Sequence, residues 1–435
     1  MRLFDFSLRF NGYNITEAKS TLAALHAKTD AQFEEFVQHQ KQSIVSHHLT
    51  ENPFYRSLVG SVHVQDWNSI PVMTKRDLQK PLDDRLSRGF SRKDVYVNKT
   101  SGSSGDPFIF AKDKWSHALT WAVIMNRFSW YNIDFNTSKQ ARFYGIPLDK
   151  KGYYKERLKD WFSHRYRFSV FDLSDAAFHR CVSTFKKTPF QYINGYTSAV
   201  VQFAKYLERE NIVLRKICPS LQVCIVTSEM LYDSDKALME TWFGVPVVNE
   251  YGASELDLIA FQNIQGEWQL NSETLFIEIV DEHNKALPYG EEGRVVITSL
   301  FNKAHPFIRY DIGDIGVISK NSSMRKPLLE SLVGRTNDIA RLPSGKKAAG
   351  LTFYYITKSI IEDDGNVKEF IIEQLSISHF KVSYVSTNEL SNTKISVIKK
   401  EMENYLESGI DITFERLAVL ERSSSGKLKQ FKSHL

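Results

Sequence analysis

The chain has 435 residues, of which 42% are hydrophobic and 25% are charged, and its formal net charge is +5. This length exceeds one ordinary hydrophobic core and predicts at least two domains, while the composition excludes a disordered or fibrous protein. The basic excess is small and dispersed and no nucleic-acid-binding motif accompanies it, so we expect no nucleic acid partner.

The cysteines and the apolar runs bear on the cellular compartment. Cys181, Cys218 and Cys224 are an odd set without paired spacing, which argues against a disulfide framework or a zinc site and favours a cytoplasmic protein. Charges interrupt the N-terminal segment 1–14, unlike a signal peptide. No apolar run approaches the roughly 20 residues of a membrane helix, so we expect no membrane insertion. The sequence leaves a monomer and a dimer equally open.

The N-terminal part is predicted to be mainly helical. Apolar residues recur at near-helical spacing over 16–50, and the aromatic-rich stretch 116–130 predicts a helix packed into the core. Between them, residues 100–107 (TSGSSGDP) predict a loop, because glycine and serine dominate the segment.

Strands and helices alternate beyond residue 190. A helical stripe covers 200–207, and LQVCIVT (221–227) is a continuous apolar run, as expected of a buried parallel strand. The next helix has Asp233 as its expected N-cap and Gly244 just past its end. VPVV (245–248) and GRVVITS (293–299) predict further strands. The pattern favours an α/β fold with open sheets flanked by helices.

A second, smaller domain is predicted after 334–338. Its expected elements are a helix near 351–361, strands near 368–374 and 379–386, a helix near 394–407 and a strand near 411–417. This is a compact α+β unit of about 100 residues, a normal domain size. We place the boundary at 335–338, which gives an N-terminal domain 1–335 and a C-terminal domain 336–435.

The loop 100–107 has the composition of a phosphate-binding loop. Glycines let the backbone present consecutive N–H groups, and hydroxyl side chains add donors, so such a loop is able to cradle phosphate oxygens. The spacing of a Walker loop is absent. A flexible linker is the competing interpretation of this segment alone.

Two acidic motifs follow. NEYGASE (249–255) comes directly after a predicted strand, where ligands of open α/β sheets bind; there Tyr251 is suited to stack on a purine and Glu255 to hold Mg²⁺. In RYDIGD (309–314) we expect a tight glycine turn that presents a carboxylate to ribose hydroxyls. Each also matches ordinary surface-turn chemistry. GRTND (334–338) and SGK (425–427) are the remaining motifs, and a lysine near a C-terminus is usually solvated.

The order of these five segments is more specific than any one of them. TSGSSGDP, NEYGASE, RYDIGD, GRTND and SSSGKLK occur between residues 100 and 429 in the order found in the acyl-adenylating superfamily, which they resemble. That superfamily contains acyl-CoA synthetases, luciferases and the adenylation domains of nonribosomal peptide synthetases. The resemblance implies a large N-terminal adenylate-forming domain and a small mobile C-terminal domain that carries a catalytic lysine.

The resemblance also assigns roles to individual residues. The ATP phosphates are assigned to Thr100, Ser101, Gly102, Ser103, Ser104 and Gly105. The adenine is assigned to Ser228, Glu229, Tyr251 and Gly252, and the ribose to Asp314 and Arg335. The acid pocket is assigned to Tyr144, Gly145, Gly195 and Tyr196, and Mg²⁺ to Glu255. Asn337 and Asp338 form the expected hinge, and Lys427 is the expected catalytic residue.

Within the superfamily the chain resembles the phenylacetate–CoA ligase-like branch. HPFIRYDIGD (305–314), TSEML (227–231) and NGYTSAV (194–200) carry this likeness, and residues 334–350 are closer to relatives from capsule and surface-polysaccharide gene sets. The expected reaction uses ATP and Mg²⁺ to convert a carboxylic acid to an acyl-adenylate with release of pyrophosphate. The acyl group then passes to CoA.

Three departures from the family pattern leave alternatives open. Phe108 replaces a phosphate-loop lysine, and Asn337 replaces the first hinge aspartate. LPSGKKAAG (342–350) lacks the usual segment along the pantetheine path, which makes an amine acceptor, such as an amino sugar or amino acid, the rival to CoA. An inactive nucleotide-binding module is a further alternative, against which the retained lysine, glutamate and aspartate argue. The identity of the acid is not encoded in any of these motifs.

Overall fold

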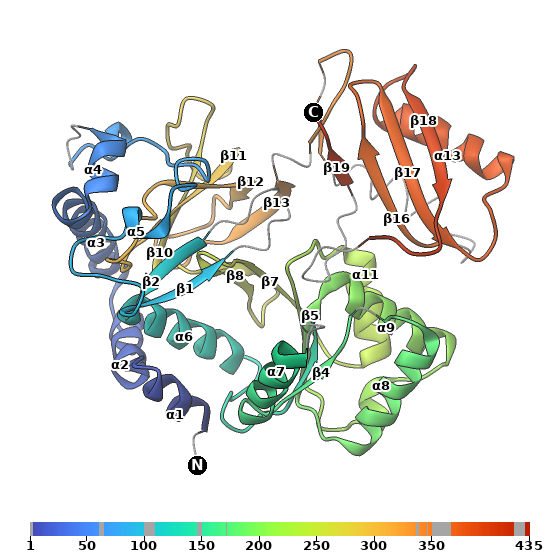
Figure 1. Cartoon of the computed structure of the whole chain (residues 1–435), viewed down its shortest axis with the longest axis horizontal. Coiled ribbons are helices and arrows are strands. Elements are labelled where there is room, and N and C mark those ends of the chain that lie inside the picture. Colours follow the sequence, from blue (N-terminus) through green and yellow to red (C-terminus); the bar gives the residue numbers. More distant parts are fainter. Residues whose placement is uncertain are drawn as a thin grey trace. The chain divides into compact units, whose positions relative to one another are not determined.

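The computed structural model describes residues 3–60, 65–99, 109–145, 150–170, 172–335, 339–345, 347–349, 367–421 and 431–435. It divides into two compact units (Figure 1), the first made of Met1–Ile312 and Val317–Glu330 and the second of Gly313–Gly316 and Ser331–Leu435. The larger unit is α/β and the smaller α+β, so the predicted fold class is confirmed. None of the helices that the structure describes is long and apolar enough to cross a membrane.

The first unit begins with a helical segment. Its elements are α1 (Leu3–Phe10), α2 (Ile15–His26), α3 (Asp30–Glu51), α4 (Pro53–Val59), the 3₁₀ helix η1 (Trp67–Ser69) and α5 (Leu82–Arg85). Residues 16–50 are helical as predicted, but a short break divides them into α2 and α3. A capping box begins α3, in which Thr29 accepts from the Gln32 N–H and the Gln32 side chain accepts from the Thr29 N–H.

A short hairpin precedes the core helix of this unit. Strands β1 (Val95–Lys99) and β2 (Ile109–Asp113) pair antiparallel. Helix α6 (Lys114–Ser129) follows β2 directly, and the Asp113 side chain caps it by accepting from the Ser116 N–H at 2.8 Å. The predicted buried helix at 116–130 is therefore confirmed.

A seven-stranded sheet in the order β4-β3-β5-β6-β7-β8-β9 forms the centre of the first unit. Its strands are β3 (Gln140–Phe143), β4 (Arg165–Phe168), β5 (Tyr192–Tyr196), β6 (Val223–Thr227), β7 (Val247–Ala253), β8 (Asp257–Gln262) and β9 (Trp268–Leu270). The five strands β3, β4, β5, β6 and β7 run parallel to one another. Strand β8 pairs antiparallel with both of its neighbours, β7 and β9. The intervening helices are α7 (Lys150–Phe162), α8 (Asp175–Lys187), α9 (Thr197–Arg209), α10 (Leu214–Ile217) and α11 (Asp233–Phe243).

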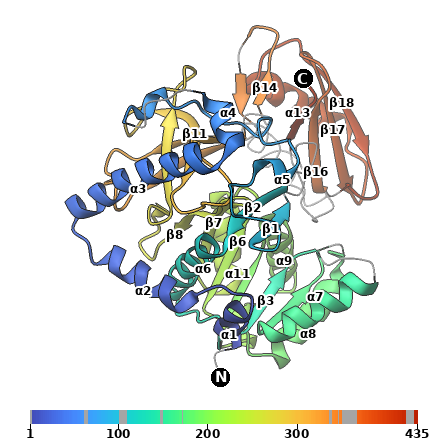
Figure 2. The same ribbon diagram turned by 60° about the vertical axis from the view of Figure 1, so that its left-hand side comes forward.

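Helices cover both faces of this sheet, as the alternation of β6 shows. Val223 and Ile225 pack with residues of α2 and α6, while Cys224 and Val226 pack with residues of α8, α9 and α11. Figures 1 and 2 show α6 on one side of the sheet and α8 and α9 on the other. Burial on both faces explains why the whole strand is apolar and why its position was predictable.

The structure differs from the sequence predictions in three segments of the chain. Asp233 is the first residue of α11 and Tyr232 occupies the N-cap, although Gly244 ends the helix in the left-handed conformation as expected. Strand β7 extends through Ala253, so most of NEYGASE is strand. The predicted tight turn at 309–314 lies within a strand, where Gly313 adopts a φ of +85°.

A second sheet has the order β10-β11-β12-β13. Its strands are β10 (Leu275–Val280), β11 (Glu292–Ser299), β12 (Tyr310–Ile318) and β13 (Leu329–Arg335). Arg309, immediately before β12, is fully buried, and its guanidinium pairs with Glu278 and donates to the Ile70 carbonyl at 2.7 Å. These contacts fix the start of β12 against β10.

The smaller unit is built on a four-stranded sheet in the order β18-β17-β16-β19. Its elements are β14 (Ile339–Arg341), β15 (Lys347–Ala349), β16 (Val367–Gln374), β17 (His379–Ser386), α13 (Asn392–Tyr405), β18 (Asp411–Arg416) and β19 (Phe431–Ser433). Ile372, Phe380 and Val382 of the sheet pack with Ile398 and Met402 of α13. The helix expected near 351–361 lies outside the described residues.

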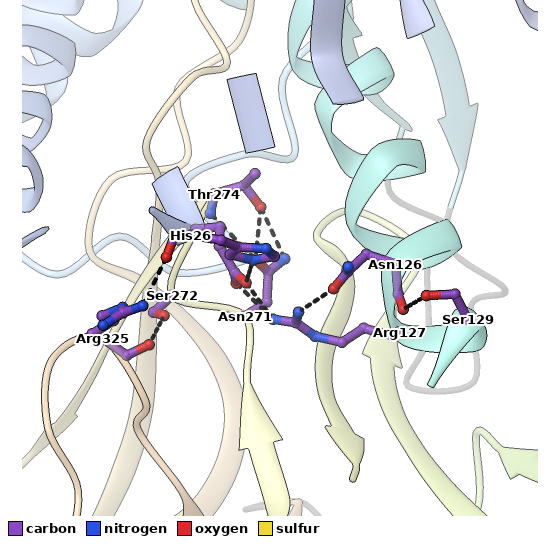
Figure 3. Close-up of polar contacts among 9 residues, drawn as sticks. His26, Asn126, Arg127, Ser129, Asn271, Ser272, Thr274 and Arg325 are labelled. Carbon is purple, nitrogen blue, oxygen red and sulfur yellow. Dashed lines mark hydrogen bonds and ion pairs between the residues drawn. The ribbon is translucent and has the colours of Figure 1, made fainter. Parts of the chain in front are cut away.

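A buried ion pair ties together three distant parts of the first unit (Figure 3). Arg127 of α6 donates to both carboxylate oxygens of Glu273 at 2.7 Å, and His26 at the end of α2 lies 2.8 Å from the same carboxylate. Burial by itself raises the pKa of Glu273, but the charge of Arg127 and the hydrogen bonds from His26 and Arg127 lower the pKa to about 2. The carboxylate therefore stays charged, and its charge is balanced.

We expect Glu273→Gln to lower the free energy of unfolding by about 3–5 kcal/mol, because it leaves the buried Arg127 guanidinium uncompensated. Since folding lowers the pKa of Glu273 from 4.5, its contribution is complete above pH 4.5 and is lost as the pH falls toward 2. Denaturant unfolding at pH 7 and at pH 3 measures both effects. Asp83→Asn is the matched control, because it breaks the exposed Arg92–Asp83 pair, worth about 0–1 kcal/mol. Equal losses in the two variants would contradict this account.

Candidate functional site

The predicted adenine and acid-pocket residues lie at the carboxyl ends of adjacent strands of the seven-stranded sheet. Tyr144 and Gly145 follow β3, Gly195 and Tyr196 end β5, Ser228 and Glu229 follow β6, and Tyr251 and Gly252 lie in β7. The register sets Gly195 beside Phe143, and Tyr196 beside Thr227. Because these strands are parallel, all four pairs of residues lie along one edge of the sheet, where ligands of such folds bind.

Two aromatic side chains face each other at this edge. The ring centroids of Tyr144 and Tyr196 are 4.6 Å apart with an interplanar angle of 55°. The Tyr144 hydroxyl donates to the Asn194 side-chain oxygen at 3.2 Å, and the Arg142 guanidinium lies 4.1 Å from the Tyr144 ring centroid. Burial raises the pKa of the Tyr144 phenol, which therefore stays a neutral donor.

A glycine is required where β3 and β5 meet. A Cβ atom at Gly195 would lie 2.5 Å from Phe143 Cβ and 2.9 Å from the Phe143 carbonyl oxygen. Any side chain there would separate the strands, so Gly195 keeps the Tyr144 and Tyr196 loops together.

The segment after β6 is held by a helix N-terminus. The Glu229 carboxylate accepts from the Ser198 N–H at 2.6 Å, and the Thr197 hydroxyl donates to the Glu229 carbonyl at 3.2 Å. A carboxylate at the first turn of α9 is favoured by the helix dipole. Ser228 adopts a φ of +73°, which turns the chain sharply between β6 and Glu229.

Tyr251 and Gly252 are packed against the antiparallel edge of the sheet. The Tyr251 ring meets the Trp268 ring edge-on, with centroids 6.0 Å apart, and only 8% of the residue is exposed. A Cβ atom at Gly252 would lie 2.6 Å from the Asp257 carbonyl oxygen. Both residues are thus fixed by β8 and β9, and the adenine-binding role of Tyr251 stays a prediction.

Glu255 lies in the turn between β7 and β8 and is 7% exposed. The Tyr310 hydroxyl donates to its Oε1 atom at 3.1 Å. Beside it is a cavity of about 10 Å³, room for roughly one water molecule. The cavity is lined by Lys112, Ser116, Thr120, Thr274 and Ser299. Lys112 of this lining forms an ion pair with Asp257.

The donor set around Glu255 fits Mg²⁺ held partly by a substrate. Within the described ranges no three histidine, cysteine, aspartate or glutamate side chains are grouped so that they could hold a metal ion by themselves. Mg²⁺ is commonly held by one or two carboxylates plus substrate phosphate oxygens and waters, which is the number of ligands that Glu255 can supply here.

The remaining predicted residues belong to the smaller unit or lie outside the described residues. Asp314 is in β12 and 5% exposed, and Arg335 is the last residue of β13. The other aspartate of the RYDIGD motif, Asp311, forms an ion pair with Arg294 at 2.7 Å, which gives it a structural role. The phosphate-loop residues Thr100 to Gly105, the hinge residues Asn337 and Asp338, and the catalytic candidate Lys427 lie outside the described residues.

Glu250 lies beside the predicted pocket and is not among the residues that the sequence assigns to it. It is the last residue of β7 that pairs with β6, where it lies opposite Thr227 and next to the predicted pocket. Burial raises the pKa of Glu250 to about 7, and the Thr227 hydroxyl and the Arg142 guanidinium offset only part of this rise. Its position within the NEYGASE motif indicates that it lies near the site. The sequence alone does not predict which face of the strand its side chain occupies.

The chain is similar in sequence and in fold to several known proteins. No family model matches the chain. Protein CapK of Staphylococcus aureus is 23% identical over 412 residues, covering 91% of this chain and 86% of CapK. The phenylacetate–coenzyme A ligase of Aromatoleum evansii is 30% identical over 128 residues, 28% of each chain. A 2-hydroxyisobutyryl-CoA ligase in complex with R3-HIB-AMP superposes with a TM-score of 0.68 at 15% identity, over 93% of this chain and 90% of that one.

Over nearly its whole length the chain therefore has the fold of this acyl-CoA ligase. The likeness to the phenylacetate–coenzyme A ligase agrees with the branch that the sequence motifs resemble.

Glu250 gives a pH-dependent prediction. Folding raises its pKa from 4.5 to about 7, so the folded state binds this proton more tightly and stability falls as the pH rises from 4.5 to 7. Glu250→Gln removes the cost of the charge, and we expect the variant to gain about 1–3 kcal/mol over the wild type at pH 8 and little at pH 5. Denaturant unfolding across this range measures the difference.

The exposed residue Glu282 provides the control, because Glu282→Gln removes the same charge where water solvates it. If Glu250→Gln and Glu282→Gln show the same pH dependence, the partly buried environment assigned to Glu250 is wrong.

Proposed function

We propose that the protein activates a carboxylic acid by joining it to AMP and then transfers the acyl group to an acceptor. In the first step a carboxylate oxygen attacks the α-phosphorus of ATP, and pyrophosphate leaves. In the second step the acceptor attacks the acyl carbon, and AMP leaves. The observation that carries the proposal is the gathering of Tyr144, Tyr196, Glu229, Tyr251 and Glu255 along one edge of a parallel sheet, in a chain with the fold of an acyl-CoA ligase.

The described residues support distinct parts of this reaction. The Tyr144 and Tyr196 rings provide an apolar wall for the organic part of the acid. Tyr251 is assigned to the adenine, and Asp314 with Arg335 to the ribose. Mg²⁺, when held by Glu255 and phosphate oxygens, would neutralise charge on the phosphates. Phosphoryl-group chemistry depends mainly on such positioning and charge neutralisation.

The proposed acceptor is CoA, with an amine as the second candidate. The likeness to phenylacetate–coenzyme A ligase and to the 2-hydroxyisobutyryl-CoA ligase supports CoA. The full-length likeness to CapK and the altered segment 342–350 support an amine, which would lose a proton as the amide forms. Mass spectrometry of reactions supplied with CoA or an amine panel separates a thioester product from an amide.

We expect Glu255→Gln to reduce carboxylate-dependent formation of AMP and pyrophosphate by orders of magnitude, because the amide keeps the shape but loses the charge that attracts Mg²⁺. Tyr310 can still donate to the glutamine oxygen, so the fold should persist, and thermal unfolding checks this. Product analysis by chromatography over a panel of acids measures the effect. Glu267→Gln, at an exposed turn of the same unit, is the control. ADP and phosphate as products would exclude adenylation.

Lys427 tests the two half-reactions separately. We expect Lys427→Ala to lower adenylate formation by about 10²–10³-fold, because an ammonium on the developing charge is worth several kcal/mol in a dry site. Acyl transfer from pre-made acyl-adenylate should survive, since the proposed hinge at 335–338 carries this lysine away before the second step. Lys429→Ala should leave both steps intact. Equal damage to both steps by Lys427→Ala would contradict the assigned role.

A further inference from the structure

Helix α7 exposes a stripe of large apolar side chains. Tyr154, Leu158 and Trp161 are 70%, 59% and 72% exposed, and Phe162 beside them is 48% exposed. Positions 154, 158, 161 and 162 follow the spacing of one helix face, so these side chains form a continuous strip. Contiguous exposed apolar surface of this kind usually marks an interaction site.

The helix is attached to the protein by its charged face. The Asp160 carboxylate is buried and accepts from Arg167 of β4 at 2.9 and 3.0 Å, and Glu156 accepts from the same guanidinium at 2.9 Å. Arg167 also donates to the Gly145 carbonyl at 2.9 Å. These ion pairs orient the helix so that its acidic side faces the sheet and its aromatic side faces water, the reverse of ordinary packing.

The charge of the helix identifies the kind of partner. Its sequence contains five basic residues, Lys150, Lys151, Lys155, Arg157 and Lys159, against two acidic ones. Arg167 engages both acids, and Lys159 also pairs with Glu156, while the helix sequence as a whole carries a formal net charge of +3. A helix rich in lysine and arginine with Trp, Phe and Leu on one side is typical of segments that lie in the interface of an anionic bilayer.

A second exposed apolar pair lies at the same end of the first unit. Phe6 and Phe10 of α1 are 56% and 81% exposed, and their rings stack with centroids 6.4 Å apart. Figures 1 and 2 both show α1 and α7 at this end. Two separate apolar contacts on one end suit an extended flat surface such as a bilayer.

We propose that the α7 strip, defined as Tyr154, Leu158, Trp161 and Phe162, docks the protein on the surface of an anionic lipid bilayer. The helix lies in the headgroup region without crossing the membrane, its aromatic side chains enter the acyl boundary, and its lysines meet lipid phosphates. A second copy of the chain is a poor occupant, because a symmetric contact would bring two basic helices together. This inference is independent of the proposed ligase chemistry.

Vesicle sedimentation tests the proposal with the full chain. We expect the wild type to bind vesicles of equal parts phosphatidylcholine and phosphatidylglycerol, to bind pure phosphatidylcholine weakly, and to be released by high salt. The variant Leu158→Gln with Trp161→Gln should bind the anionic vesicles at least about tenfold more weakly, because it removes apolar area that the bilayer would bury. Its thermal unfolding should be unchanged, since both side chains are exposed in the free protein.

Ile264→Gln is the matched control, because Ile264 is 66% exposed on the turn between β8 and β9 and should not affect vesicle binding. Absence of binding to anionic vesicles would overturn the proposal, as would equal losses in the control and the double variant. A wild-type dimer that the double variant abolishes in analytical ultracentrifugation would also overturn it, because the strip would then be a contact between copies.

Discussion

Parallel pairing of β3, β5, β6 and β7 is the constraint on which the candidate site depends. Strands that run in one direction all end at one edge, and the chain must leave each of them through a loop at that edge. Strand pairing therefore brings together segments that are far apart in the sequence, from Tyr144 to Glu255. The hydrophobic layers on both faces of the sheet hold this arrangement.

The polar groups at and around this edge are constrained by burial. The Glu229 carboxylate accepts a hydrogen bond from the N-terminus of α9, and the Glu255 carboxylate accepts one from the Tyr310 hydroxyl. Glu250 has a weaker set of partners, which is why its pKa is raised whereas that of the fully paired Glu273 is lowered. A carboxyl that titrates near neutral pH beside a binding edge is a usual feature of functional sites.

Much of the fold could be predicted from local patterns. The apolar run of β6, the glycine that ends α11 and the aromatic-rich stretch of α6 are properties of short segments, and the structure confirms the elements they predict. The break between α2 and α3 was overlooked because the apolar spacing continues through it, although Thr29 and Gln32 have the sequence of a capping box.

Long-range contacts were outside the reach of this reasoning. Arg127 and Glu273 are separated by 146 positions, and no local pattern pairs them. The raised pKa of Glu250 depends in the same way on burial by distant parts of the chain. Motif order predicted which residues to consider, and packing determined the environment of each.

In the proposed reaction a carboxylate oxygen of the acid forms a bond to the α-phosphorus of ATP. The most direct test of this step uses an acid that supports pyrophosphate release, labelled with oxygen-18 in its carboxylate. After complete transfer to the acceptor, mass spectrometry of the AMP should find one labelled oxygen, because that atom stays with phosphorus when the acyl bond breaks. Unlabelled AMP, or label found in inorganic phosphate together with ADP, would contradict the account.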